Sequence, residues 1–222
     1  MAQEYYKAYD ERYKAIHQKG HSWAAENRTP MVLDTLRKYG LSQNAALLEI
    51  GCGEGRDARA VLEAGFNLTA TDISPEAIRY CKEHFPAYEN RFRVMDCLAD
   101  RHDPQYDFIY AVAVLHMLVL DQDRDGFYSF IRDHLKESGL ALILSMGDGE
   151  FEMRSDIRTA FQLQERNHFS GKVQVAGTSC RMVSFPTFEA EIARNGLEIV
   201  EKGLCEAMPD FNSLLYAVVR RK

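Results

Sequence analysis

The chain has 222 residues, of which 46% are hydrophobic and 27% are charged, a composition that suits one globular domain with a substantial core. Its formal net charge of -6 disfavours nucleic acid as a partner, because affinity for phosphates depends mainly on lysine and arginine.

The cysteine pattern and the hydropathy indicate in which cellular compartment the protein is found. Five cysteines with no C-x-x-C pair predict free thiols in a reducing environment and no metal site. No apolar run is long enough to span a bilayer, and the opening residues MAQEYYKAYDERYK contain no signal-peptide core. We expect a cytoplasmic protein that binds neither nucleic acid nor membrane, and we leave its oligomeric state open.

Residues 1–40 precede the first predicted strand and have helical patterns. Tyr5, Tyr9 and Tyr13 recur every four residues, so they share one face of a helix. We expect this face either to pack on the core or to form a lid over a ligand.

From residue 45 onward, apolar runs alternate with helical patterns. Strands are predicted at 45–50, 66–71, 91–95, 106–112 and 140–145, and helices at 54–64, 75–85 and 124–137. The alternation indicates a doubly wound α/β fold with a mostly parallel sheet, since parallel neighbours need crossover connections.

The end of the chain breaks this alternation. A helix at 187–195 is followed by strand-like runs at 197–204 and 213–221, whose short connection predicts an antiparallel hairpin. Residues 147–184, between the fifth strand and this helix, are too long for a simple connection and are typical of a lid or binding segment.

The stretch LEIGCGEGR, residues 48–56, places three alternating glycines between a strand and a helix, an arrangement that points backbone N–H groups at a ligand. The last glycine of the NAD fingerprint is replaced by Arg56, and the G-K-[ST] of a phosphate-binding P-loop is absent. Glu49 would repel a pyrophosphate but could stabilise an ammonium group. The loop therefore favours a ligand that joins an adenosine to a cationic amino acid.

These residues resemble motif I, E/D-x-G-x-G-x-G, of the class I S-adenosylmethionine-dependent methyltransferases. The order of elements is similar to that family's Rossmann-like seven-stranded sheet with an antiparallel last strand. The resemblance implies S-adenosyl-L-methionine as cofactor and S-adenosyl-L-homocysteine as product. It also implies one domain over 1–222, with an N-terminal helical segment or lid (1–40), a cofactor-binding core (41–146), an insertion or substrate lid (147–184), and a final helix and hairpin (185–222).

The resemblance also implies roles for individual residues. Asp72 would accept hydrogen bonds from the ribose, Asp96 would meet the adenine amino group, and His116 is the candidate catalytic residue near the methyl donor. Arg28 is a candidate for the cofactor carboxylate. The cofactor-binding residues implied are Glu49, Gly51, Cys52, Gly53, Asp72, Ile73, Asp96, Cys97, Ala111, Val112 and Arg28.

The acceptor class follows from motifs that are missing. The segment YAVAVLH replaces the N/D-P-P-Y/F motif of amino-methylating nucleic-acid enzymes, and neither a Pro-Cys pair nor a Mg-binding acidic cluster is visible. A small molecule therefore remains as the expected methyl acceptor. If Arg154 or Arg181 faces the cleft, we expect this acceptor to be anionic. Within the family the chain looks most similar to the tellurite-resistance and thiopurine-type enzymes. The alternatives are a NAD(P)-dependent oxidoreductase and a non-catalytic cofactor-binding protein of the same fold.

Overall fold

The computed structural model describes residues 4–24, 27–100, 102–205 and 213–222. One seven-stranded sheet with the order β10-β11-β5-β4-β1-β2-β3 forms its centre. The strands of this sheet are β1 (Ala46–Ile50), β2 (Asn67–Asp72), β3 (Phe92–Val94), β4 (Tyr106–Val112), β5 (Leu135–Met146), β10 (Leu197–Cys205) and β11 (Leu214–Arg221). Only β11 runs antiparallel to its neighbours, β5 and β10. The predicted fold class and the antiparallel hairpin are therefore confirmed.

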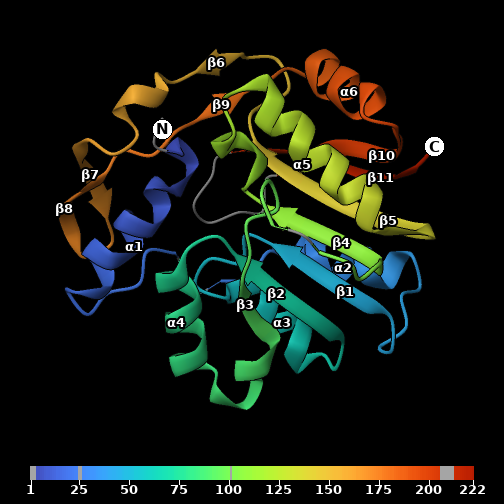
Figure 1. Cartoon of the computed structure of the whole chain (residues 1–222), viewed down its shortest axis with the longest axis horizontal. Helices are drawn as coiled ribbons and strands as arrows, with labels where there is room; N and C mark the ends of the chain where they lie inside the picture. Colours follow the sequence, from blue (N-terminus) through green and yellow to red (C-terminus); the bar gives the residue numbers. More distant parts are fainter. Residues whose placement is uncertain (1–3, 25–26, 101, 206–212) are drawn as a thin grey trace.

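Helices cover both faces of the sheet (Figure 1). They are α2 (Pro30–Lys38), α3 (Arg56–Glu63), α4 (Pro75–His84), α5 (Asp121–His134) and α6 (Phe185–Arg194). One apolar cluster joins α2, α3 and α4 to one face, and a second joins α5 and α6 to the other. Sequestering both faces explains why the strands are almost continuously apolar. None of the described helices is long and apolar enough to cross a membrane.

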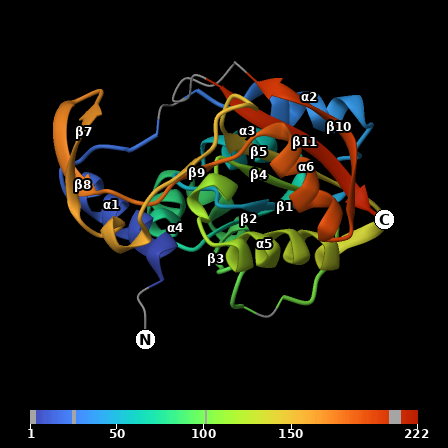
Figure 2. The same ribbon diagram turned by 90° about the horizontal axis from the view of Figure 1, so that it is seen from above.

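The N-terminal segment and the insertion gather at the edge where the parallel strands end. The helix α1 (Ala8–His17), preceded by the 3-10 turn η1 (Tyr5–Lys7), contacts the hairpin of β7 (Leu163–His168) and β8 (Gly171–Ala176). Figure 2 shows both on one side of the sheet, away from the chain's C-terminus. The insertion also contains β6 (Met153–Arg154), paired with β9 (Arg181–Met182), and the 3-10 turn η4 (Ile157–Thr159). Sequence patterns predicted no strand within residues 147–184, so these four strands were missed.

Two predicted helix boundaries were also wrong. Gly55 has a φ of +78° and caps α3, so this helix starts at Arg56 and not at residue 54. The predicted helix 124–137 is α5, which ends at His134. Its end is set by Leu135, which is buried and pairs with Tyr106 of β4. Strand pairing here overrides helix propensity. Residues 206–212, which connect the hairpin strands, lie outside the described residues.

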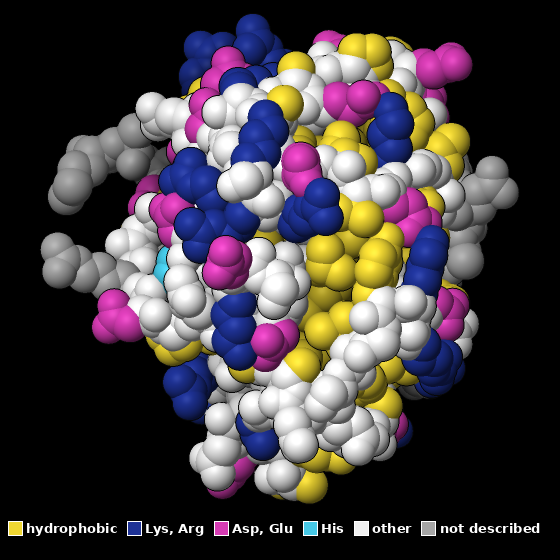
Figure 3. Space-filling model, turned by 90° about the vertical axis from the view of Figure 1, so that its right-hand side faces the viewer, with side chains coloured by type: hydrophobic (Ala, Val, Ile, Leu, Met, Phe, Trp, Pro, Cys, Tyr) yellow, Lys and Arg dark blue, Asp and Glu magenta, His cyan; other side chains and the backbone are white. Residues whose placement is uncertain are grey.

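The end of the molecule that carries β10 and β11, opposite α1 and the β7–β8 hairpin, has hydrophobic side chains at its surface, which appear yellow in Figure 3. The outer strand β10 exposes Val200 and Leu204. A hollow of about 250 Å³ is lined there by residues of α2, β10 and β11.

A buried ion pair joins the two helices on one face. The Arg124 guanidinium of α5 donates to both carboxylate oxygens of Glu191 in α6, at 2.7 and 2.6 Å, and both side chains are fully buried. Tyr128 adds a hydrogen bond to the same carboxylate at 3.1 Å.

We expect Glu191→Ala to lower the free energy of unfolding by about 3–5 kcal/mol, because it leaves the Arg124 charge buried without its partner. Urea denaturation followed by circular dichroism measures this loss. The matched control is Glu189→Ala on the same helix, which removes a surface pair with Lys202 and should cost about 0–1 kcal/mol. Equal losses in the two variants would contradict the role given to the buried pair.

Candidate functional site

The glycine loop between β1 and α3 is held in a conformation that favours glycine. Gly51, Gly53 and Gly55 have φ values of +73°, +54° and +78°. A Cβ at Gly51 would lie 2.3 Å from Cγ2 of Val114, and one at Gly55 would lie 2.9 Å from Sγ of Cys81. Glycine is therefore required both by the backbone and by close packing.

Asp72, at the end of β2, ties this loop to the next strand-to-helix turn. Its carboxylate accepts the N–H of Gly53 at 2.8 Å through one oxygen and the N–H of Ser74 at 2.8 Å through the other. Burial raises the pKa of Asp72 to about 6, against the effect of these hydrogen bonds. Ser74 also caps α4, since its hydroxyl accepts the N–H of Ala77 at 3.0 Å.

Glu49 lies beneath the glycine loop with only 2% of its surface exposed. The Tyr110 hydroxyl of β4 donates to its carboxylate at 2.9 Å. Burial, followed by repulsion from Asp57, raises the pKa of Glu49 well above its usual range. Ala111 and Val112 follow Tyr110 and are buried. A cation placed over Glu49 would restore its ionised form.

Asp96 and Cys97 follow β3. The Asp96 carboxylate accepts the N–H of Leu98 at 2.9 Å and lies 3.6 Å from the Lys7 ammonium and 3.5 Å from the Tyr6 hydroxyl. Burial, and next the charge of Asp96, raises the pKa of the Cys97 thiol to about 12. The structure thus brings the N-terminal segment onto this carboxylate.

The remaining predicted residues lie around the same edge. Ile73 is half-buried beside Asp72, and Arg28 is exposed. Arg28 precedes Thr29, whose N–H and hydroxyl donate to the Asp57 carboxylate at 2.5 and 2.8 Å. Arg28 is thereby held close to the first turn of α3.

His116 belongs to the 3-10 turn η3 (Leu115–Met117), directly after β4. Ala113, between the strand and this turn, has a φ of +57°, an uncommon conformation for a residue with a side chain. Arg124 fixes the turn by donating to the carbonyl oxygens of Leu115 at 2.9 Å and Leu118 at 3.2 Å. Burial, then the charges of Arg124 and Arg12, lower the pKa of His116 to about 4, so its imidazole is neutral at pH 7.

A segment that we call the N-terminal strap, residues 4–24, covers the loop. A Cβ on Gly53 would lie 2.7 Å from the Tyr13 hydroxyl, so this tyrosine lies directly on the loop. Asp10 accepts the Ser74 hydroxyl at 2.6 Å, and the Tyr5 hydroxyl donates to Asp123 at 2.6 Å. Tyr5 and Tyr13 are buried, as a packing face requires.

His17 fastens the strap to two elements at once. One ring nitrogen lies 2.8 Å from the Glu54 carboxylate of the glycine loop and the other lies 2.7 Å from the Glu76 carboxylate of α4. Two carboxylate acceptors require an N–H on each ring nitrogen, which is the imidazolium form. Burial alone would lower the pKa of His17, but these hydrogen bonds outweigh it and raise the pKa above the usual value. Sequence reasoning missed His17 and Glu54; the acid inside the loop, GEG, was the only local signal.

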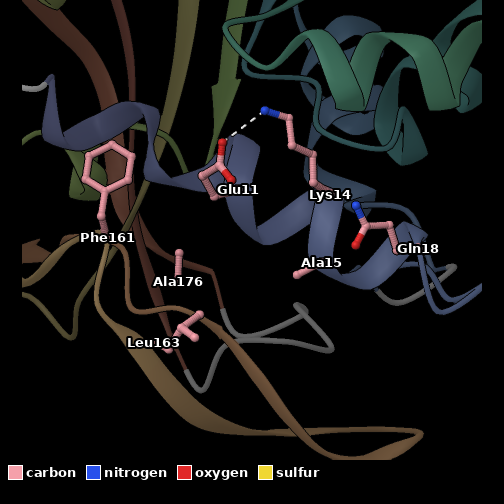
Figure 4. A pocket seen from close by; sticks show the side chains of 7 residues that line it. All are labelled: Glu11, Lys14, Ala15, Gln18, Phe161, Leu163 and Ala176. Atoms are coloured by element: carbon pink, nitrogen blue, oxygen red, sulfur yellow. Dashed lines mark hydrogen bonds and ion pairs between the residues drawn. The ribbon is translucent and has the colours of Figure 1, made fainter.

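The structure places both arginines that the sequence analysis considered for an anionic acceptor. Arg154 is exposed on β6, and Arg181 donates to the Val119 carbonyl at 2.8 Å and to Asp121 at 2.7 Å. A hollow of about 460 Å³ lies between α1 and the insertion, on the side of α1 that carries Glu11 and Lys14 (Figure 4). This hollow is separated from the glycine loop by α1 itself.

Comparisons with known proteins agree with this geometry. Residues 48–141 match a family model described as a methyltransferase domain. The CcbJ methyltransferase from Streptomyces caelestis has a similar structure, with a TM-score of 0.71 and 15% identity over 97% of this chain and 98% of that chain. No curated protein matches the chain by sequence.

Two further solved structures are similar. The 1,6-didemethyltoxoflavin-N1-methyltransferase from Burkholderia thailandensis has a TM-score of 0.69 and 17% identity over 100% of this chain and 92% of that chain. A S-adenosylmethionine-dependent methyltransferase from Clostridium acetobutylicum has a TM-score of 0.66 and 15% identity over 86% and 89% of the two chains. At these identities the likeness establishes a shared fold.

We expect His17→Gln to destabilise the protein by about 1.5–3 kcal/mol at pH 6, because hydrogen bonds to charged groups are lost. The pKa of His17 is higher in the folded protein than in the unfolded chain, so protonation of His17 stabilises the fold. This stabilisation is fully present below the usual histidine pKa and is lost as the pH rises through the pKa of the folded protein. Thermal unfolding at a series of pH values should therefore show a difference between wild type and variant that shrinks with increasing pH. His84→Gln, on the exposed side of α4, is the control. A difference that does not depend on pH would refute the charged form of this contact.

Proposed function

We infer that this chain is a class I S-adenosylmethionine-dependent methyltransferase, which transfers a methyl group to a nucleophilic oxygen, nitrogen, sulfur or related atom of a small molecule. One observation supports the proposal most strongly. Five buried carboxylates surround a glycine loop whose backbone takes the left-handed form. His17 pairs with Glu54 and Lys7 lies 3.6 Å from Asp96, and a ligand that carries a sulfonium and an ammonium group would add positive charge beside the others. These carboxylates belong to Glu49, Glu54, Asp57, Asp72 and Asp96.

We propose that the cofactor lies along the ends of β1, β2 and β4. Glu49 would stabilise its ammonium group and Arg28 its carboxylate, while the backbone of Gly51, Cys52 and Gly53 would follow the amino-acid portion. Ala111 and Val112 would lie beneath the methionine portion. The proximity of Glu49 to Tyr110 and of Asp72 to Gly53 supports this path.

At the other end of the path, Asp72 would accept the ribose hydroxyls and Ile73 would pack on the adenine. Asp96, with Cys97 beside it, would take the adenine amino group. Asp96 already faces the Lys7 ammonium and the Tyr6 hydroxyl, so its carboxylate is available to donors on the strap side of the edge.

The bound sulfonium supplies an activated methyl carbon, which the acceptor attacks in line as the carbon–sulfur bond breaks and its electron pair goes to sulfur. The protein's contribution is then alignment and exclusion of water. We propose that His116 lines the acceptor side as a neutral imidazole. With a pKa of about 4, it is a weaker base than an acceptor with a tightly held proton would require.

The strap and the insertion are proposed to act as lids, as the division at residues 40, 146 and 184 predicts. Tyr13 on the glycine loop and the contact between α1 and β8 support this role. We also propose that, within the family, the chain is most similar to the tellurite-resistance and thiopurine-type enzymes. One of the similar solved structures is named as an N1-methyltransferase, which makes a nitrogen acceptor a reasonable first choice for assays.

Calorimetric titration tests the cofactor, with S-adenosylmethionine and NADH added to separate samples of purified protein. We expect saturable binding of S-adenosylmethionine only, and binding of NADH alone would favour an oxidoreductase. Incubation with labelled S-adenosylmethionine and a library of small amines, phenols and thiols then tests turnover. Cofactor binding without any labelled product would favour a non-catalytic protein of the same fold.

We expect Asp72→Ala to weaken S-adenosylmethionine binding by about 1–3 kcal/mol, the usual cost of losing a charged hydrogen-bond partner. Calorimetry measures the change. Asp34→Ala, on the exposed side of α2, is the control and should leave the affinity unaltered. An unchanged affinity in the Asp72 variant would remove this residue from the cofactor site.

The affinity should also depend on pH through Asp72. Only the ionised carboxylate can accept both ribose hydroxyls, so binding should weaken as the pH falls below about 6, the pKa of Asp72 in the free protein. Asp72→Asn does not titrate and should lose this dependence. If the asparagine variant keeps the same pH profile, another group is responsible.

A further inference from the structure

Two arginines meet at one backbone carbonyl where the strap faces the insertion. Arg12 of α1 donates from Nη2 to the carbonyl oxygen of Gly177 at 2.8 Å. Arg166 of β7 donates to the same oxygen at 3.3 Å. Arg12 also donates from Nε and Nη2 to the Ala176 carbonyl, at 3.1 and 2.8 Å, and from Nη2 to the Thr178 hydroxyl at 2.9 Å. Two guanidinium groups are therefore held together by a single acceptor.

Neither arginine has an acidic partner among the described residues, where no carboxylate oxygen lies within 4.0 Å of Arg12 or Arg166. Arg12 is nevertheless only 5% exposed. Buried cations are normally paired, as Arg124 is with Glu191. Burial, with a contribution from the neighbouring Arg166, lowers the pKa of Arg12, which reflects the cost of holding this charge without an anion.

Two aromatic rings and the 176–178 turn contact the Arg12 guanidinium. The rings of Tyr9 and Trp23 lie 4.7 and 4.5 Å from its central carbon and occupy positions over the guanidinium plane. Nε and Nη2 donate to the 176–178 turn, whereas Nη1 has no acceptor among the described residues. Arg166 uses Nη2 for its bonds to Gly177 and to Gln164, the latter at 2.8 Å, so Nη1 of Arg12 and the other donors of Arg166 are suited to the two oxygens of a carboxylate.

The turn that accepts the hydrogen bonds of Arg12 lies against η3, next to the proposed acceptor side. The Ser179 hydroxyl donates to the carbonyl of Met117 at 2.6 Å, which fixes the turn after Thr178 against η3 and His116. The charge of Arg12 reaches His116, whose pKa it helps to lower. Glu191 neutralises Arg124, so Arg12 supplies the uncompensated positive charge in this region.

We propose that Arg12 and Arg166 bind a carboxylate group of the methyl acceptor, so that the substrate is a small organic acid. The proposal rests on the methyltransferase function inferred above and adds the chemical class of its acceptor. It replaces Arg154 and Arg181 as anion-binding candidates: Arg154 is exposed on β6, and Arg181 is already bonded to Asp121. If Arg12 instead served only to clamp α1 to the insertion, its replacement would change stability but would confer no preference for anions.

Binding of benzoate and of benzamide, its neutral analogue of the same shape, to the full chain distinguishes these roles. Ligand-observed NMR is carried out with S-adenosylhomocysteine bound, so that the cofactor site is filled. We expect saturable benzoate binding with a Kd below about 10 mM and at least roughly tenfold weaker binding of benzamide. Equal affinities, or no saturable benzoate binding in that range, would overturn the proposal.

Arg166→Gln is the main variant, because Arg166 is exposed and its loss should not prevent folding. It should weaken benzoate binding by roughly tenfold while leaving the thermal midpoint and the affinity for S-adenosylhomocysteine unchanged. Lys172→Gln removes an equal charge from the same hairpin, where Lys172 is paired with Glu165, and should not alter benzoate binding. Arg12→Lys keeps the charge but not the planar fork, and it should also weaken benzoate binding.

An unchanged benzoate affinity in both arginine variants would contradict the assignment, as would an equal loss in Lys172→Gln. Failure of the wild-type protein to bind S-adenosylhomocysteine, measured first by calorimetry, would instead count against the methyltransferase function itself.

Discussion

The structure depends on one constraint: parallel strands end at the same edge of the sheet, and here the acids at the ends of β1, β2 and β3 are buried at that edge. A buried carboxylate is costly unless donors surround it. Asp72 takes the N–H groups of the two adjoining turns, and Glu49 takes the hydroxyl of Tyr110. The conformation of the glycine loop and the positions of α3 and α4 follow from satisfying these groups.

The N-terminal strap completes the same task from outside the sheet. Glu54 accepts the N–H groups of Trp23 and Ala24, at 2.6 and 2.7 Å, in addition to the contact with His17. The strap thus supplies hydrogen-bond donors to buried acids that have too few donors within the sheet and its loops. The same segment covers the edge of the sheet and supplies donors to its acids. This explains why a helix at the start of the chain lies beside loops that come much later in the sequence (Figure 1).

The edge is also polarised. Acids lie under and around the glycine loop, whereas Arg12 of α1 places a positive charge near His116 in η3. Such a field favours a cation on one side and an anion on the other. A positively charged methyl donor and a negatively charged acceptor would therefore be drawn to adjacent positions before any specific contact forms.

Sequence patterns predicted the parts of this site that are encoded locally. The spacing of the three glycines and the acids at strand ends identified the loop and the fold, because each depends on neighbouring residues. The partners of His17 and Arg12 could not be predicted, since Glu76 and Gly177 are far away in the sequence and meet them only in the folded chain. The end of α5 was misplaced for a related reason: the pairing of Leu135 with Tyr106 is a tertiary contact.

Glycine at position 53 is required twice, once by its φ of +54° and once by the Tyr13 hydroxyl, which occupies the space of a side chain. The loop and the first helix are therefore matched surfaces, although about forty residues separate them in the chain. A chimera that exchanged the loop with that of a related protein would have to exchange α1 as well. For recombination or design, the two segments form one inseparable module.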